Sequence, residues 1–254
     1  MRTIIILILL FCSFNVKAQF SLDAKTDMIL LPLGVIGASV GNIMTYEDGL
    51  LTNDDFAGID KLNIPFFDRW NTTYNPTYAE ISDILLALQF VSPLTYSFAS
   101  EYKSQFQTNA IMYIETMSIN YGLNSITKSL VGRFRPFSYD STTIKNILYD
   151  NDTKYSFYSG HSSTAFASAI FNIIVLTSKS GGLNKTLGVT LNIMNATAIA
   201  TLRVMAGKHF FSDVLVGAIV GSGVAYLTTE LHKNQPKTQA NEFEPMRFNL
   251  SIPF

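Results

Sequence analysis

An arginine, a histidine and an aspartate stand close together in an otherwise apolar C-terminal region. They are Arg203, His209 and Asp213, and the flanking runs 193–202 and 214–227 contain no charged residue. Ionisable groups in such a setting are expensive to desolvate unless they are paired or used in chemistry. His209 and Asp213 are four residues apart, so the carboxylate can hold one imidazole nitrogen and leave the other free as a nucleophile or base. Arg203 offers a fork of donors that suits phosphate.

Two further groups of residues favour an anionic ligand. Lys128 and Arg135 are seven residues apart, which is two helical turns, so they lie near one face of a helix. Ser159, Gly160 and His161 follow a polar loop and precede an apolar run that is typical of a helix. The glycine allows the backbone to approach a ligand closely, and the start of a helix offers unpaired N–H groups to an anion.

The three groups resemble, in order and in internal spacing, the three signature blocks of the type 2 phosphatidic acid phosphatase (PAP2) superfamily. That superfamily also contains the bacterial class A acid phosphatases and the vanadium haloperoxidases, and this chain looks most like its membrane-associated bacterial branch. Tyr158 stands where the family usually has proline, and Leu202 where it usually has serine. Neither departure removes an ionisable residue from the three blocks.

The resemblance implies a role for each residue of the blocks. His209 is expected to attack phosphorus and form a phosphohistidine, Asp213 to orient and polarise it, and His161 to protonate the leaving group. The residues expected to bind the phosphate are Lys128, Arg135, Arg203, Ser159 and Gly160. No metal and no cofactor are expected, because side chains supply the positive charge.

Two more residues are considered beside the blocks. Arg133 lies outside the matched positions and is a weaker candidate for substrate contact. His232, the third histidine, lies outside every block near the end of the last apolar run, and a solvated helix cap is expected there.

The implied function is hydrolysis of a lipid phosphate monoester or pyrophosphate without a metal. The alternatives are a soluble periplasmic acid phosphatase of broad specificity, a vanadate-dependent haloperoxidase, or a non-catalytic membrane protein that binds phospholipid. The chain is short for a haloperoxidase and lacks the extra helical domain of those enzymes. No pattern in the sequence identifies the lipid or the oligomeric state.

Composition agrees with an apolar helical protein in contact with a membrane. Of the 254 residues, 48% are hydrophobic and 15% are charged, below the roughly 25% of ordinary soluble domains. The mean hydropathy is +0.22. A net charge of −1 argues against nucleic acid as a partner, so the expected partners are a lipid phosphate and the bilayer.

The apolar runs predict an all-α protein, a bundle of about five to six helices that is membrane-embedded. Helices are expected over 79–99, 107–130, 162–178, 186–206 and 210–232. In an up-and-down bundle this order places the three blocks at one end. The expected organisation is a signal peptide (1–18), an N-terminal segment with a short apolar helix and an interfacial loop (19–78), a catalytic core (79–233) and a polar tail (234–254).

The N-terminus and the lysines predict the orientation. Arg2, the apolar run 4–14 and the small-residue pattern at 16–18 are typical of a secretory signal. Lysines concentrate in the loops opposite the blocks, which by the positive-inside rule are cytoplasmic. We therefore expect five spans, with 28–44 interfacial or re-entrant, and a site facing the periplasm from a bacterial inner membrane. Gly217, Gly221 and Gly223 favour close packing between membrane helices.

Overall fold

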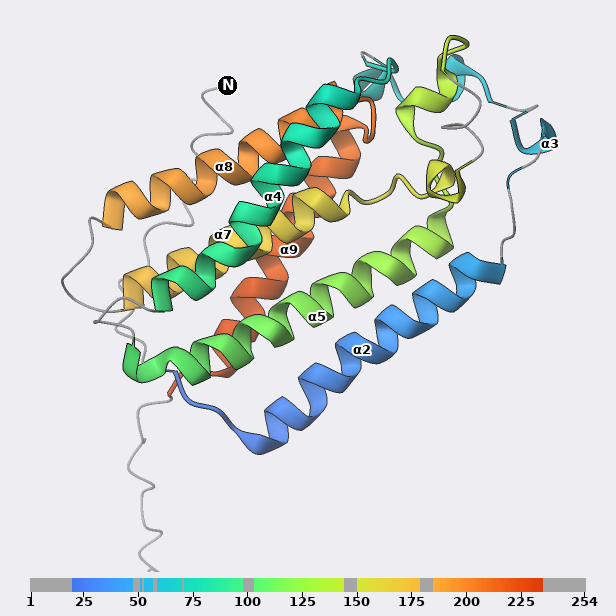
Figure 1. Ribbon diagram of the computed structural model, residues 1–254. Helices are drawn as coiled ribbons and strands as arrows, with labels where there is room; N and C mark the ends of the chain where they lie inside the picture. The colour runs from blue at the N-terminus through green and yellow to red at the C-terminus, as the bar shows by residue number, and fades with distance from the viewer. Residues whose placement is uncertain are drawn as a thin grey trace, which may run out of the picture.

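The protein is described by a computed structural model over residues 20–47, 51, 53–56, 59–69, 71–97, 103–143, 150–178 and 185–234. Within these ranges the chain forms six long helices and several short ones, with a single isolated β-bridge in place of any strand (Figure 1). The all-α prediction is confirmed. The expected signal peptide and nearly all of the expected tail lie outside the described residues. The long helices are α2 (Ala24–Glu47), α4 (Pro76–Ser97), α5 (Phe106–Val131), α7 (Gly160–Ser178), α8 (Lys185–Met205) and α9 (Phe211–Leu231).

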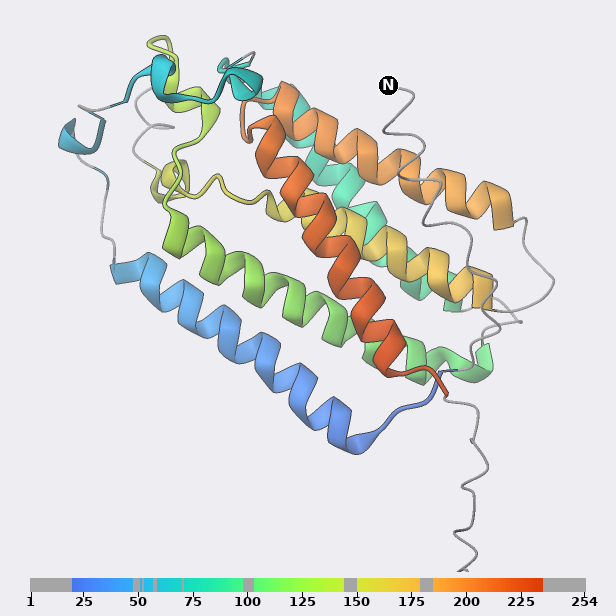
Figure 2. The same cartoon turned by 180° about the vertical axis from the view of Figure 1, so that it is seen from behind.

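The six helices form a bundle with α7 at its centre. Helix α7 contacts α4, α5, α8 and α9, whereas α2 packs on the outer side of α5 (Figures 1 and 2). Helices α2, α5 and α8 end where α4, α7 and α9 begin. We call this the loop end, because most of the short helices gather there (Figure 1). The opposite end is called the far end.

Local sequence explains where the helices stop at the loop end. Helix α5 ends because Gly132 takes the left-handed conformation (φ 56°), and its N–H donates to the carbonyl of Lys128. In the turn between α8 and α9, Gly207 also has positive φ (68°), and a Cβ there would overlap the carbonyl of Thr73. The five expected helices are all present, with every boundary within three residues of the expected one.

Helix α2 corrects the interpretation of the N-terminal segment. The run 28–44 was expected to be a short helix, interfacial or re-entrant, but the structure has one continuous helix of 24 residues, Ala24–Glu47. Pro32 lies inside this helix without ending it. A Cβ on Gly34 or Gly41 would overlap the backbone of α5, so these glycines let the two helices touch. The glycines of 28–44 are therefore packing positions.

Four helices are long and apolar enough to cross a membrane, judged by length and composition. They are Ala24–Thr45 within α2, together with α7, α8 and α9. The first was not among the five spans expected from the sequence, and α4 and α5, which were, are not in this set. Large apolar side chains such as Leu88 and Ile219 are well exposed on the outer faces. These observations support a membrane protein.

Helices α7 and α9 touch along a glycine seam, which we define by Gly217 and Gly221. A Cβ at Gly217 would lie 2.6 Å from the carbonyl oxygen of Ser159, and one at Gly221 would overlap the backbone of Ser163. No larger side chain fits without moving one of the helices. The seam therefore fixes the start of α7 against the first turns of α9.

Candidate active site

All eight residues that the sequence selected lie at the loop end. They come from the end of α5 and the turn after it, the start of α7, the end of α8, and the turn into α9. In chain order they are Lys128, Arg135, Ser159, Gly160, His161, Arg203, His209 and Asp213. The geometric expectation that the three blocks share one end of the bundle is confirmed.

His209 is held in one tautomer by the backbone. Its side chain is 1% exposed, and Nδ1 lies 2.8 Å from the carbonyl oxygen of Ser156. Because a carbonyl only accepts, Nδ1 carries the hydrogen and donates it, and Nε2 keeps the lone pair. Nε2 faces Arg135, whose Nη1 is 3.2 Å away. The lone pair on Nε2 accepts from this guanidinium, and an imidazole in this tautomer has the form that a nucleophile needs.

The surroundings of His209 keep the ring neutral. Burial, followed by the positive charges of Arg135, Arg203 and Lys128, holds the pKa of His209 well below its ordinary value near 6.5. Burial and nearby cations both disfavour the imidazolium. Three of the residues expected to bind phosphate thus surround the expected nucleophile.

Asp213 is connected to His209 through a third residue, Ser156. Its Oδ2 lies 3.8 Å from Nδ1 of His209, whereas it accepts a hydrogen bond from Ser156 Oγ at 2.5 Å and one from the N–H of Phe210 at 2.9 Å. Ser156 therefore offers its carbonyl to the histidine and its hydroxyl to the aspartate. Sequence reasoning missed Ser156, because it lies in a loop without a readable pattern.

Arg133 is held between two buried carboxylates. It donates from Nη1 to Asp213 Oδ1 at 2.5 Å and from Nη2 to Asp68 Oδ2 at 2.8 Å, and both aspartate side chains are fully buried. Asp68 also accepts from the N–H of Ser212 at 3.0 Å and from its hydroxyl at 2.6 Å. The guanidinium lies 4.0 Å from the ring centre of Phe210. These contacts give Arg133 a positioning role beneath Asp213.

Arg135 has most of its donors engaged by the protein. Nε and Nη2 bind the carbonyl and the carboxylate of Asp152 at 2.8 and 2.6 Å, and Nη1 donates to the carbonyl of Lys208 at 2.8 Å. Burial raises the pKa of Asp152, but the charges of Arg135 and Lys128 outweigh it and lower that pKa to about 2. Asp152 is therefore ionised and anchors the arginine. It too lies in the loop before α7 and was missed.

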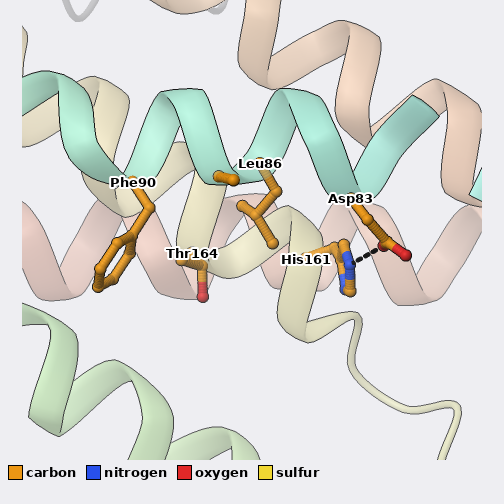
Figure 3. Close-up of a pocket in the computed structure, with 6 residues that line it drawn as sticks. Asp83, Leu86, Phe90, His161 and Thr164 are labelled. Carbon is orange, nitrogen blue, oxygen red and sulfur yellow. Dashed lines mark hydrogen bonds and ion pairs between the residues drawn. The ribbon is translucent and has the colours of Figure 1, made fainter. Parts of the chain in front are cut away.

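A single carboxylate joins His161 to Arg203. Oδ1 of Asp83, on α4, lies 2.7 Å from His161 Nε2 and 3.1 Å from Arg203 Nη1 (Figure 3). Arg203 also donates to the hydroxyl of Ser82 at 3.2 Å, while its buried Nε has no hydrogen-bond partner in the part of the chain that the structure describes. Sequence reasoning missed Asp83, although a charged residue inside the apolar run 79–99 is the same signal that selected Arg203.

The remaining candidates line the start of α7 and the end of α5. Ser159 caps α7, because its Oγ accepts the N–H of Ser162 at 3.3 Å. A Cβ on Gly160 would lie 2.8 Å from Oδ1 of Asn124, so the position has little room for a side chain. Within the described residues, the Lys128 ammonium has no hydrogen bond or ion pair, which leaves its charge available to a ligand.

A groove opens beside His161 and Asp83, between α4 and α7. Figure 3 shows the side chains that line it, and its volume is about 400 Å³. The other lining residues are Leu86, Ala87, Phe90 and Thr164, and they follow α4 and α7 away from the loop end. The groove is therefore ionisable at one end and mostly apolar along the rest of its length.

Comparison with known proteins gives relatives that are named as phosphatases or as phosphatase-related proteins. The chain is 28% identical over 114 residues to an "Undecaprenyl-diphosphatase" of Sulfolobus acidocaldarius, covering 45% of this chain and 50% of the relative. It is 30% identical over 127 residues to a "Phospholipid phosphatase homolog 1.2 homolog" of Caenorhabditis elegans (40% and 37%). It is 27% identical over 151 residues to a "PA-phosphatase related-family protein" of Dictyostelium discoideum (56% and 55%). No solved structure matches significantly.

The similarity covers only part of each relative. The chain spans about half the length, or less, of the relatives that it matches. They come from an archaeon, a worm and an amoeba, so they do not confirm the expected bacterial branch. A sequence model of the PAP2 superfamily matches residues 109–237, which is half of the chain and includes all eight candidate residues. The chain therefore belongs to the PAP2 superfamily.

Proposed function

We propose that the protein is a phosphatase that hydrolyses a lipid phosphate monoester or pyrophosphate. The observation that carries the proposal is the groove between α4 and α7, which connects His161 and Asp83 to an apolar channel along the helices. A phosphate held among the cations would leave its hydrocarbon chain beside Leu86 and Phe90. Two relatives are named as an undecaprenyl-diphosphatase and a phospholipid phosphatase homolog, and these names support the same substrate class.

The first chemical step uses the lone pair on Nε2 of His209. This nitrogen attacks phosphorus and forms an N–P bond, while the P–O bond to the leaving group breaks and the leaving oxygen takes a proton from His161. Lys128, Arg135 and Arg203 neutralise charge on the non-bridging oxygens, which is the largest contribution in phosphoryl transfer. The first N–H groups of α7 add donors, because a helix start leaves them without intrahelical partners.

The second step releases phosphate. His161, now without its proton, takes one from water as the water oxygen attacks the phosphohistidine and the N–P bond breaks. The lone pair returns to Nε2, and the bond from Nδ1 to the Ser156 carbonyl keeps the ring in the same tautomer throughout. Asp83 is a positioning residue, because it holds the imidazole of His161 and the guanidinium of Arg203 with one oxygen.

The soluble acid phosphatase is the competing function. It would act on small water-soluble esters and would need no apolar groove beside its acid. The exposed apolar faces of α2, α8 and α9 also disfavour a freely soluble protein. We therefore place the bilayer among the partners and propose that lipid enters the site from it.

Phosphate release by the purified full-length protein in detergent tests this function. The panel contains long-chain phosphatidate, a polyprenyl pyrophosphate, short-chain phosphatidate and p-nitrophenyl phosphate, assayed with chelator present. We expect kcat/KM for the long-chain substrates to exceed that for the soluble ester by about tenfold or more, as burial of several methylene groups predicts. A preference for the soluble ester would reverse the proposal in favour of the acid phosphatase.

A pair of groove variants makes the test specific. Ala87→Trp fills the groove beside His161, whereas Ala198→Trp fills a groove on α8 lined by Met194, Thr201 and other residues without ionisable side chains. Ala87→Trp should lower kcat/KM for long-chain substrates about tenfold and leave p-nitrophenyl phosphate unchanged. Ala198→Trp should change neither. An equal loss on both substrates would show that the groove does not bind the lipid chain.

A further inference from the structure

A second cluster of ionisable residues lies at the far end of the bundle. Asp27 of α2, Glu115 of α5 and His232 after α9 each present one ligand atom, and these atoms all lie within 4.8 Å of one another. His232 is 2% exposed and Glu115 1% exposed. The sequence-based interpretation of His232 as a solvated cap is therefore wrong, and its burial follows from the position of α2.

His232 directs one nitrogen into this cluster. Its Nδ1 lies 2.8 Å from the carbonyl oxygen of Thr228, so Nδ1 carries a hydrogen and donates it. Its Nε2 lies 2.9 Å from Asp27 Oδ1 and 3.2 Å from Glu115 Oε2. A backbone carbonyl on the outer nitrogen is the usual arrangement behind a metal-bound histidine, because it fixes the ring and raises its basicity.

Glu115 is left without a donor. Among the described residues, no group donates a hydrogen bond to either of its carboxylate oxygens, although both oxygens are buried. Nε2 of His232 carries at most one hydrogen, and the hydrogen-bond geometry assigns it to Asp27. A buried carboxylate without a hydrogen-bond donor is costly, and such groups normally have a partner. A protonated His232 would donate to Asp27 and would reach Glu115 through its charge alone.

We propose that these three residues bind a divalent metal ion of the zinc type. A cation between them would satisfy Asp27, Glu115 and the lone pair of His232 Nε2 at the same time. Zinc is bound by histidine nitrogen and carboxylate oxygen at about 2.0–2.2 Å, which places neighbouring ligand atoms roughly 3.3–3.5 Å apart. The separations of 2.9 and 3.2 Å are close to that arrangement. A nitrogen ligand favours zinc over manganese, magnesium and calcium.

The ion would fasten the N-terminal helix to the core. Helix α2 packs almost entirely on α5, and the chain before it reaches α9 through the bond from the N–H of Ser21 to the carbonyl of His232 at 2.9 Å and the bridge between Phe20 and Lys233. A metal bound by Asp27, Glu115 and His232 would join α2, α5 and the end of α9 at the far end, where few other contacts connect these helices. This site is at the opposite end from the phosphatase residues, so its role is structural.

Metal content of the full-length protein in detergent tests the proposal. The protein is dialysed against EDTA, then against buffer with Zn²⁺, Mn²⁺ or Mg²⁺ alone, and analysed by elemental mass spectrometry. We expect one Zn²⁺ per chain, weaker retention of Mn²⁺ and none of Mg²⁺. A hundredfold excess of Zn²⁺ over its Kd should raise the thermal midpoint by about 5–10 °C.

Matched variants locate the ion. Glu115→Gln keeps the shape of the side chain but removes a charged ligand, and should weaken Zn²⁺ binding by about 100-fold or more. Glu230→Gln, which changes a carboxylate paired with Lys233 outside the cluster, should retain full stoichiometry. His209→Ala should also retain it, because that histidine is at the loop end. If Glu115→Gln does not fold, Asp27→Asn, at a partly exposed position, replaces it.

Three results would overturn the proposal. Retention of less than about a tenth of a Zn²⁺ per wild-type chain would exclude the site. Full retention by both Glu115→Gln and Asp27→Asn would show that the ion binds elsewhere. Loss of the ion from His209→Ala would place it at the loop end instead.

Discussion

Two buried histidines at opposite ends of this bundle have the same kind of hydrogen-bond partner at Nδ1 but differ in the charges that surround them. His209 and His232 each donate from Nδ1 to a backbone carbonyl at 2.8 Å, so each presents Nε2 to its surroundings. Around His209 the positive charges of Arg135, Arg203 and Lys128 act on the ring, while the carboxylate of Asp213 lies 3.8 Å from Nδ1. Around His232 the nearest charges are the carboxylates of Asp27 and Glu115.

The difference shows that the surrounding charge, more than the histidine itself, decides the chemistry. Cations around a neutral imidazole gather an anion and bring its phosphorus to the lone pair. Carboxylates around the same imidazole gather a cation and turn the lone pair into a ligand. The contrast can be tested by removing residues from each end.

The largest effect should follow removal of His209. His209→Ala deletes the nitrogen that attacks phosphorus, so activity should fall by roughly 10⁴-fold or more, as for other nucleophile deletions. No acid-labile phosphoenzyme should be trapped with a labelled substrate. Phosphoenzyme in this variant would assign the nucleophile to another residue.

The effect of removing His161 should depend on the leaving group. His161→Ala should cost roughly 10²- to 10⁴-fold on an alkyl phosphate, the usual range for general acid catalysis, and distinctly less on p-nitrophenyl phosphate. The phenolate needs little protonation, so the first step survives. Rapid-quench experiments with the aryl substrate should show phosphoenzyme accumulating. An equal loss on both substrates would rule out the acid role.

Arg133 should affect the rate through Asp213, without contacting substrate. Arg133→Gln leaves Asp213 and Asp68 without their shared cation, so kcat should fall by roughly 10–100-fold, the range seen for residues that orient a site. KM should stay unchanged, and the thermal midpoint should drop because two buried carboxylates lose their counter-charge. Arg133→Lys should recover part of both. A rise in KM with kcat unchanged would instead place Arg133 against the substrate.

Asp83 should have a smaller effect with a leaving-group signature. Asp83→Asn keeps a polar group beside His161 and Arg203 but removes its charge, and kcat on an alkyl phosphate should fall about tenfold. The loss on the aryl ester should be smaller if Asp83 acts through His161. Combined with His161→Ala, the second change should then add nothing on the alkyl substrate.

The smallest effect concerns stability and pH. Burial and nearby cations lower the pKa of His209, so its imidazole stays neutral in the folded state. In the unfolded chain the same imidazole takes up a proton below about pH 6.5. Protons bound only by the unfolded state reduce stability as pH falls. Between pH 6.5 and 5.5 the free energy of unfolding of the wild type should fall by about 1 kcal/mol. The His209→Gln variant should keep this ~1 kcal/mol, and denaturant unfolding of both proteins measures the difference. Parallel curves would show that His209 is not held neutral.

The sequence predicted the helices and the gathering of the blocks because both depend on local pattern. Apolar runs predicted the helix boundaries within three residues. The residues that hold the candidates in place were not predicted. Asp152 and Ser156 belong to a loop whose path depends on contacts with Arg135 and His209, which are far away in sequence.

The far end was misread for a different reason. His232 looked exposed because the run 28–44 was not expected to cross the bundle, and only a full-length α2 brings Asp27 beside it. Gly34 and Gly41, seven residues apart on one helical face, were the pattern that predicts a packed helix. The domain boundaries at 78 and 233 and the cleavage after Ala18 stay predictions.

The glycine seam between α7 and α9 decides which side of the site can open. Backbone contact at Gly217 and Gly221 means that separating these helices would expose main chain without side chains to replace the lost contact. Between α4 and α7 the contact includes side chains such as Leu86, which packs against the cluster of Ala165 and Ala169 and can change rotamer. The bundle thus has one rigid wall and one compliant wall, and a lipid arriving sideways from the bilayer would pass through the α4 side.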